Sequence, residues 1–362
     1  MKRLELLDYG RFFAVVVVVL FHYTFNGIAN GKISSIAQIP AVVEFTKYGY
    51  LGVEFFFMIS GYVIFFSARN ATASKFAVSR ALRLYPAYWC AILFTSFFAL
   101  LWGGSMMAVS PLQILANFSM LQVHIGIDHV DGVYWTLVYE LSFYTAIFFL
   151  LFCGLRDKLA SLITGWPLLF IIAVLLNHED ITYMGGFYYY FCAGALFAIL
   201  KEKITWPALF SLLTTYAFCI HFSTGNVEKL MDAKNVEYSA TVVGVLITLF
   251  FMLFAFQNTR KAQTLSLPMS KLAGALTYPV YLIHAHFGYM FISKFATEEN
   301  KIFIYILTFF IVFLVALFIH KVIEVRLSHI WKELFNLTLG RVVDFSQSLF
   351  SGVRIPYGSR IR

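Results

Sequence analysis

Long apolar stretches follow one another along almost the whole chain. A helix that crosses a bilayer needs about 20 mostly apolar residues. Ten stretches of about that length can be delimited, at 11–29, 49–67, 87–102, 134–154, 159–176, 184–200, 206–222, 239–256, 271–295 and 302–323. An eleventh, at 111–123, is too short to cross comfortably and predicts a short re-entrant or surface helix. The pattern therefore predicts an all-α integral membrane fold with about ten transmembrane helices.

The composition agrees with this class and excludes an ordinary soluble domain. Hydrophobic residues fill 60% of the 362 positions and charged residues only 13%, which is far from the soluble average. A net charge of +8 would suggest nucleic acid in a soluble protein, but here the basic residues follow membrane topology, so we expect no nucleic-acid partner. The four cysteines lie within apolar stretches without metal-ligand spacing, so we expect neither a metal site nor disulfides.

Basic residues mark every second connection between the predicted helices. If the N-terminus is cytoplasmic, the inner connections are basic, whereas the outer ones mix lysines with acids. The positive-inside rule then places both chain ends in the cytoplasm. The inner basic residues are Arg69, Lys75, Arg80, Arg83, Arg156, Lys158, Lys201, Lys203, Arg260, Lys261 and Lys271.

The expected domain organisation is one membrane domain followed by a tail. Residues 1–324 form the predicted transmembrane domain, and 325–362 form a basic cytoplasmic tail in which 330–339 is a candidate interfacial amphipathic helix. The first apolar run contains Arg11 and His22 and lacks a convincing cleavage site, so we expect no cleavable signal.

Arg11 and His22 interrupt a segment whose residues between them, 12–21, include no polar side chain. Eleven residues make about three helical turns plus roughly 20°, so both side chains project from one face, about 16 Å apart along the axis. Ionisable residues in hydrocarbon usually face a protein interior or a wet cavity. The plainer alternative is that Arg11 reaches the lipid headgroups and His22 makes one interhelical hydrogen bond.

Two carboxylates are expected near the depth of His22. Counted from the outer ends of their helices, His22, Glu140 and Glu54 lie about 10, 9 and 7 Å deep. These depths are also within reach of the interface, so separate snorkelling remains an alternative. A carboxylate beside an imidazole orients a general base and stabilises its protonated form.

Arg80 and Arg83 lie three residues apart, just before the predicted third span, and so share a helix face. With Arg11 at a similar level, three guanidiniums suit a phosphate-bearing ligand, because their fork matches phosphate oxygens. The alternative is that they only enforce topology or contact lipid phosphates. His284 follows Pro279 in the ninth span, near mid-membrane, where a functional role and a structural hydrogen bond are both plausible.

In this order, these segments resemble acyltransferase family 3, a family of multi-pass membrane proteins. The matching segments, within about residues 3–326, are Leu7-Asp8-Tyr9-Gly10-Arg11 with His22 eleven residues after Arg11, Gly49 to Tyr62 with Glu54, Arg80-x-x-Arg83-Leu84-Tyr85-Pro86, Tyr134-Trp135-Thr136-Leu137-Val138-Tyr139-Glu140, Thr277 to His284 and a final Glu324. The family often has Asp where Glu54 stands, and the Pro common after the last-helix Glu is missing after Glu324. The chain resembles the stand-alone form, without the esterase-like domain that many relatives carry.

The resemblance implies transfer of an acyl group, usually acetyl, from cytoplasmic acyl-CoA to a hydroxyl of a cell-surface or lipid-linked glycan in a bacterial inner membrane, without a metal. Arg11, Arg80 and Arg83 would bind the CoA phosphates, and the pantetheine arm would extend along the first helix to His22. His22 would act as general base, oriented by Glu140 or, as the second choice, by Glu54. Direct transfer is favoured, and a route through an acyl-histidine is the alternative. The candidate substrate-binding residues are Glu54, His284 and the pair Tyr134 and Trp135, which would stack on a sugar at the outer mouth.

Two other functions fit the same polar residues. Buried His and Glu residues also form proton relays, so a proton-coupled transporter or flippase of a glycan or lipid-linked intermediate is the main alternative. A non-enzymatic membrane sensor that binds CoA or acidic lipid is the second. Acetyl transfer, counterflow of substrate and binding alone distinguish the three.

Overall fold

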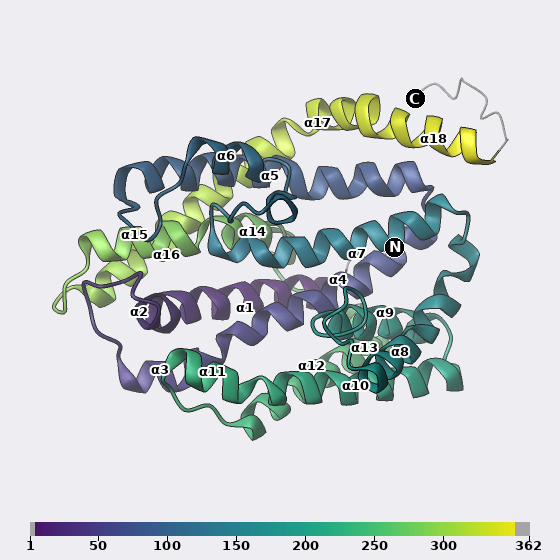
Figure 1. Ribbon diagram of the computed structural model, residues 1–362, viewed down its shortest axis with the longest axis horizontal. Helices are drawn as coiled ribbons and strands as arrows, with labels where there is room; N and C mark the ends of the chain where they lie inside the picture. The colour runs from purple at the N-terminus through teal and green to yellow at the C-terminus, as the bar shows by residue number, and fades with distance from the viewer. Residues whose placement is uncertain (1–3, 352–362) are drawn as a thin grey trace.

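The computed structural model describes residues 4–351 as a bundle of helices, with no strand among them. Most long helices run roughly parallel to one another, along the horizontal direction of Figure 1. The first half contains α1 (Glu5–Phe21), η1 (His22–Asn26), α2 (Gly27–Ala29), α3 (Pro40–Thr46), η2 (Lys47–Leu51), α4 (Gly52–Arg69), α5 (Ala73–Trp102), α6 (Pro111–Asn117), η3 (Gln122–Ile125), η4 (Gly132–Tyr134), α7 (Trp135–Phe152), η5 (Arg156–Lys158) and α8 (Leu159–Leu176).

The second half continues the same architecture and ends in a run of joined helices. It contains α9 (Tyr188–Glu202), α10 (Trp206–Gly225), α11 (Val227–Lys234), α12 (Ala240–Gln257), α13 (Arg260–Thr264), α14 (Ser270–Ile283), α15 (Ala285–Phe295), α16 (Lys301–Phe318), η6 (Ile319–Arg326), α17 (Ser328–Phe335), η7 (Asn336–Gly340) and α18 (Arg341–Ser351).

The all-α membrane fold predicted from the apolar stretches is confirmed. Within residues 4–351, eight helical stretches are long and apolar enough to cross a bilayer. The two other predicted spans coincide with α9, which has 15 residues, and with α14–α15, which is interrupted at His284. The short helix predicted near 111–123 forms as α6, which begins at Pro111 behind a Ser110 capping box.

The third span starts earlier than the sequence suggests. The predicted 87–102 segment is the second half of α5, which runs unbroken from Ala73 to Trp102 and includes Pro86. Arg80 and Arg83 therefore lie inside a helix, about 10 and 15 Å along its axis from Ala73. Positive charge was taken as the mark of a loop, but both arginines are half-buried helical residues that line a cavity.

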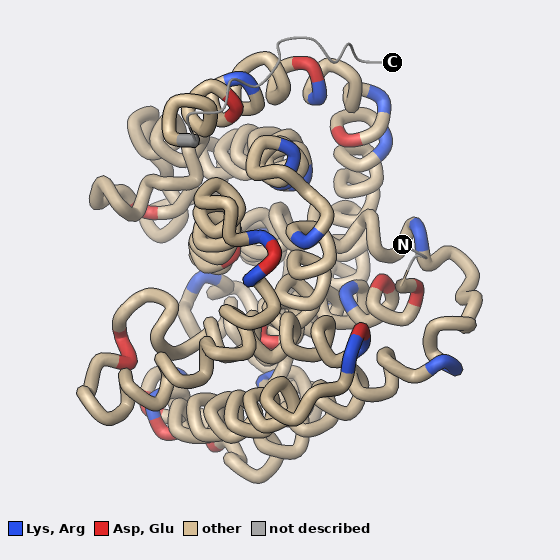
Figure 2. The backbone as a smooth tube through the Cα atoms, turned by 90° about the vertical axis from the view of Figure 1, so that its right-hand side faces the viewer, with Lys and Arg blue, Asp and Glu red and all other residues tan. Residues whose placement is uncertain are grey.

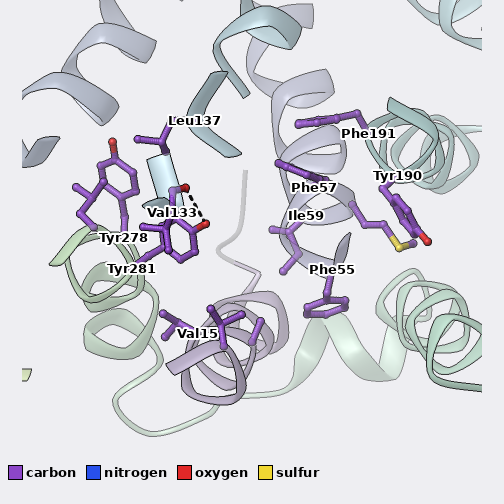
Figure 3. Close-up of a cluster of buried hydrophobic side chains, with 14 of the residues drawn as sticks. Val15, Phe55, Phe57, Ile59, Val133, Leu137, Tyr190, Phe191, Tyr278 and Tyr281 are labelled. Carbon is purple, nitrogen blue, oxygen red and sulfur yellow. Dashed lines mark hydrogen bonds between the residues drawn. The ribbon is translucent and has the colours of Figure 1, made fainter. Parts of the chain in front are cut away.

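The centre of the bundle is formed where α4 crosses α9 with almost no space between their backbones. A Cβ added at Gly194 would lie 1.8 Å from the Met58 carbonyl oxygen, and one added at Gly61 would lie 2.0 Å from that of Phe191. Small residues permit such close helix contacts in membranes, where packing drives association. Around this crossing, aromatic and aliphatic side chains of α1, α4, α7, α9 and α14 form a buried cluster (Figure 3).

The C-terminal helices lie along α5 instead of leaving the bundle. Two side chains mark this contact: Trp331 packs on Trp89 with ring centroids 5.9 Å apart, and the Ser74 hydroxyl donates to the Gly340 carbonyl at 3.3 Å. The candidate amphipathic segment at 330–339 falls within α17 and η7. The rest of the predicted tail, residues 352–362, lies outside the described residues.

The start of α1 and the end of α18 lie toward the same end of the bundle (Figure 1). Viewed onto that end, Lys and Arg segments occur around much of the bundle (Figure 2). The positive-inside rule expects basic residues in the connections on the cytoplasmic side. The cytoplasmic position of this end of the bundle stays a prediction.

Candidate functional site

A cavity of about 270 Å³ lies among α1, α4, α5, α7 and α14. The structure brings four of the residues singled out from the sequence to its wall: Arg11 from α1, Arg80 and Arg83 from α5, and Glu140 from α7. Phe56, Phe57 and Leu137 supply part of its apolar wall. Three guanidiniums face one carboxylate, so the wall carries an excess of positive charge.

The arginines are held mainly by aromatic rings, which leave much of their hydrogen-bonding capacity unused. The Arg83 guanidinium lies 5.2 Å from the Tyr278 ring centroid, and that of Arg80 lies 5.7 Å from the Tyr144 centroid. Arg11 pairs with Asp8 at 3.5 Å. Neither Arg80 nor Arg83 has an ion-pair partner among residues 4–351, and the Arg80 Nε is buried without a hydrogen bond. Such arginines are prepared for an anionic ligand.

Glu140 belongs to this cavity and not to the surroundings of His22. Its Oε1 accepts a hydrogen bond from the Ser60 hydroxyl at 2.8 Å and another from the Tyr144 hydroxyl. The expectation that this carboxylate lies beside the imidazole is therefore wrong. Depth along α7 was estimated from the sequence, but the direction in which residue 140 projects depends on how α7 is rotated against α4 and α5.

His22 begins η1, a π-helical turn that continues α1. Its Nδ1 contacts the Tyr289 hydroxyl of α15, and that hydroxyl also accepts a hydrogen bond from the Asn26 amide at 3.0 Å. Asn26 and Tyr289 are buried, whereas His22 is half-buried. The groups that orient the imidazole are thus a phenol and an amide.

His284 lies directly against His22. The two ring centroids are 5.0 Å apart, with the planes at 75°. His284 is fully buried, and its Nδ1 hydrogen-bonds to the Tyr281 carbonyl at 2.7 Å, whereas its Nε2 has no partner among the described residues. Because a carbonyl only accepts, Nδ1 carries the proton and Nε2 is an unused acceptor.

The arginine cavity and the histidine pair are separated by Tyr281. Its ring lines the cavity on one side, and its centroid is 5.5 Å from that of His284. Its hydroxyl hydrogen-bonds to Thr136 at 2.8 Å and donates to the Val133 carbonyl at 3.2 Å (Figure 3). His22 is not among the lining residues, so the cavity stops short of it. Within residues 4–351 the arginine cavity does not continue along α1 toward His22 as expected, because Val15 and Val18, which occupy the same helix face, are buried.

Glu54 lies on a different side of α4 from the cavity. It is buried, and one of its oxygens, Oε2, has no hydrogen-bond partner in residues 4–351. It lies on the side of α4 that faces Tyr190 of α9 and Cys219 of α10. The predicted convergence of His22, Glu140 and Glu54 is therefore not found: the three groups lie in three different environments.

Tyr134 and Trp135 do not form the exposed stacking surface expected at the outer mouth. Tyr134 is fully buried and packs on Tyr88, with centroids 5.0 Å apart. Trp135 is half-buried and packs on Phe187 at 5.0 Å. Tyr134 is thus part of the core, because the turn η4 directs its ring inward toward α5.

Three residues of the site were not found from the sequence: Asn26, Tyr281 and Tyr289. A signal existed for Asn26, which lies four residues after His22 and so near the same face. No comparable signal marks the two tyrosines among 21 in the chain. No cluster that could hold a metal ion occurs in the part of the chain that the structure describes.

Comparison with known proteins identifies a family that covers most of the chain. Residues 4–321 match the family model described as "Acyltransferase domain". A 151-residue region is 30% identical to Nodulation protein 10 of Rhizobium leguminosarum bv. viciae. The match covers 36% of this chain and 41% of that protein, so the chain spans about two fifths of the length of this relative. No solved structure matches.

Proposed function

This chain belongs to the membrane acyltransferases of family 3, and from that premise we propose that it transfers an acetyl group from cytoplasmic acetyl-CoA to a hydroxyl of a cell-surface or lipid-linked glycan. The single observation that carries the proposal is the position of three arginines and the Tyr281 ring between the predicted cytoplasmic side and the pair His22 and His284. We place the enzyme in a bacterial inner membrane.

The arginine cavity supports the donor half of the reaction. Coenzyme A carries phosphate groups, and Arg80 and Arg83 lack carboxylate partners within the described residues. Bidentate arginine–phosphate contacts are among the stronger hydrogen bonds in proteins. Arg11, Arg80 and Arg83 would hold the phosphates, and the apolar wall formed by Phe56 and Leu137 would accept the pantetheine arm.

The surroundings of His22 support the acceptor half. Asn26 donates to the Tyr289 oxygen, whose second lone pair would accept the Nδ1–H of His22 in the tautomer that we propose for the reaction. In that tautomer Nε2 is the free base. It would take the proton of the acceptor hydroxyl as the oxygen attacks the thioester carbonyl. When the tetrahedral intermediate collapses, the C–S bond breaks and the imidazolium returns the proton to the CoA sulfur.

Tyr281 must move for the two halves to meet. The thioester in the arginine cavity would reach His22 only if the Tyr281 ring left its place between Thr136 and His284. Its hydroxyl makes two hydrogen bonds to the η4–α7 junction, so rotation costs those bonds, each about 1 kcal/mol net. We propose that donor binding in the cavity offsets this cost.

The test is transfer of labelled acetyl by the purified protein in lipid nanodiscs. Wild type is expected to move [14C]acetyl from acetyl-CoA to glycans extracted from the cells that make it, and His22→Ala to lose at least a hundredfold in rate. His221→Ala is the matched control, because His221 is exposed on α10. Full activity of His22→Ala would refute the base. Counterflow of glycan without acetyl transfer would identify a transporter instead.

A further inference from the structure

Lys32 follows α2 and lies half-buried beside the histidine site. Its Nζ donates to His286 Nε2 at 2.9 Å, and that nitrogen also accepts the Gly132 backbone N–H at 3.3 Å. The His286 Nδ1 hydrogen-bonds to the Val130 carbonyl at 3.0 Å and therefore carries the proton. His286 is thus held as a neutral acceptor, which orients the ammonium of Lys32 without neutralising its charge.

The carboxylate that acts on Lys32 is already engaged elsewhere. Asp131 is fully buried, its Oδ1 accepts the Val133 N–H at 3.2 Å, and its Oδ2 accepts the His286 N–H at 2.9 Å. Lys32 has no ion-pair partner among residues 4–351. Burial lowers the pKa of Lys32, and Asp131 opposes that shift. A half-buried ammonium in this state is stabilised by any anion that approaches from outside.

A second lysine lies on the same side of the molecule. Lys234 ends α11, and its Nζ donates to the Asn30 side-chain oxygen, which is again a neutral partner. Asn30 lies only two residues before Lys32 in the turn that follows α2, so this hydrogen bond brings the Lys234 ammonium to the segment that carries Lys32. Two like charges held together with neutral partners form a site for an anion.

Tyr289 connects Lys32 to His22, the proposed base. Lys32 Nζ lies 5.8 Å from the centroid of the Tyr289 ring, and the Tyr289 hydroxyl contacts His22. One aromatic ring therefore separates the ammonium from the imidazole. This spacing would let a short oligosaccharide present a hydroxyl to His22 and a charged substituent to Lys32 at the same time.

We propose that the acceptor is acidic: it carries a carboxylate or phosphate that binds Lys32 and Lys234 while its hydroxyl lies at His22. This inference rests on the proposed acyltransferase function and adds the chemical class of the acceptor. By binding the acidic group, the two lysines fix the position of the glycan relative to His22 and so select which of its hydroxyls receives the acyl group.

The experiment uses the full-length protein in nanodiscs with [14C]acetyl-CoA and total glycans of the producing cells, freed of ester groups with hydroxylamine. The products are separated on an anion-exchange column. Label in the retained, acidic fraction supports the proposal. Reduction of uronic carboxyls and removal of phosphate with hydrofluoric acid, each on a separate glycan sample, then identify which anion is needed. Label confined to neutral glycans overturns the acidic acceptor but keeps the acyltransferase, whereas no transfer to any glycan overturns both.

Variants test the two lysines directly. Lys32→Gln and Lys234→Gln are expected to raise the KM for the acidic acceptor about tenfold, with the KM for acetyl-CoA unchanged, because a charge-assisted hydrogen bond is lost. Lys32→Arg is expected to restore most of the affinity. Lys229→Gln is the matched control, since Lys229 is exposed on the same helix α11. Equal acceptor KM values in wild type and both Gln variants would overturn the site.

Discussion

The imidazoles of His22 and His284 come from opposite ends of the chain and meet with ring centroids 5.0 Å apart. His22 is positioned by the π-helical turn η1, and His284 lies where α14 gives way to α15. At that break the His286 amide donates to Asp131. These two imidazoles, one half-buried and one buried, have no carboxylate partner among the described hydrogen bonds and form the centre of the proposed acyl transfer.

Tyr289 is expected to position His22. Tyr289→Phe keeps the ring, which is buried, but removes the hydroxyl that contacts His22 Nδ1. We expect kcat to fall about tenfold with little change in the KM for acetyl-CoA, since only the tautomer and orientation of the base are disturbed. Steady-state kinetics in nanodiscs checks this. Tyr305→Phe, at a half-buried tyrosine of α16, is the control. A purely structural role would lower stability and leave kcat per folded molecule unchanged.

Arg83 is expected to bind the donor. Arg83→Gln removes a guanidinium that lies over the Tyr278 ring in the cavity. The KM for acetyl-CoA should rise tenfold or more, because hydrogen bonds to charged groups contribute about 1.5–3 kcal/mol. Titration with acetyl-CoA and with dephospho-CoA derivatives measures the loss. Arg156→Gln, at a half-exposed arginine of η5, should bind like wild type. Unaltered donor binding by Arg83→Gln would exclude the residue from the phosphate site.

We expect the Tyr281 ring to prevent hydrolysis of bound acetyl-CoA, so that the thioester is broken only when the acetyl group is transferred. Tyr281→Ala removes the ring between the arginine cavity and His284. Water then reaches the bound thioester, so CoA release without acetyl transfer should increase several-fold. A thiol assay alongside label transfer gives the ratio of the two. Thr136→Val breaks one hydrogen bond of Tyr281 and leaves the ring in place, so its ratio should lie between those of wild type and Tyr281→Ala. A constant ratio in all three proteins would show that Tyr281 is no barrier.

We expect any side chain larger than hydrogen at Gly194, where α9 crosses α4, to lower the stability of the protein. Gly194→Ala places a Cβ 1.8 Å from the Met58 carbonyl oxygen, so the helices must separate. We expect a loss of about 2 kcal/mol, within the usual cost of overpacking. Thermal unfolding in detergent measures it. Gly165→Ala is the matched control, because a Cβ there meets nothing within 4 Å. Equal melting temperatures for the two variants would contradict this account of the crossing.

How far the sequence determines the site can be judged from α1 and α7. Within α1, helical periodicity predicted that Arg11 and His22 share a face, and both do face the α14–α15 side. Periodicity refers to one helix only. For Glu140 the angular position depends on how α7 packs on α4, and a local pattern does not contain that information. Ser60 and Tyr144, which hold the carboxylate, come from two different helices.

The fold was easier to predict from the sequence than the site, because the length of each apolar stretch indicates whether it can span a bilayer. The boundary of α5 was the main error, since Arg80, Arg83 and Pro86 are ordinary signs of a helix end. Internal charge is tolerated there because the arginines face a cavity. The roles of Tyr289 and Tyr281 could not be predicted from the sequence, because each depends on a contact with a residue 145 or more positions away in the chain.

The place where the arginine cavity ends also matters to the cell that carries the protein. A conduit open from one water phase to the other would leak protons and ions and dissipate the membrane potential. The Tyr281 ring lies between Thr136 and His284, and the arginine cavity ends before it reaches His22, so we expect this state of the protein not to conduct protons or ions. Transfer of an acyl group past Tyr281 must therefore occur without both sides of this ring being open to water at the same time.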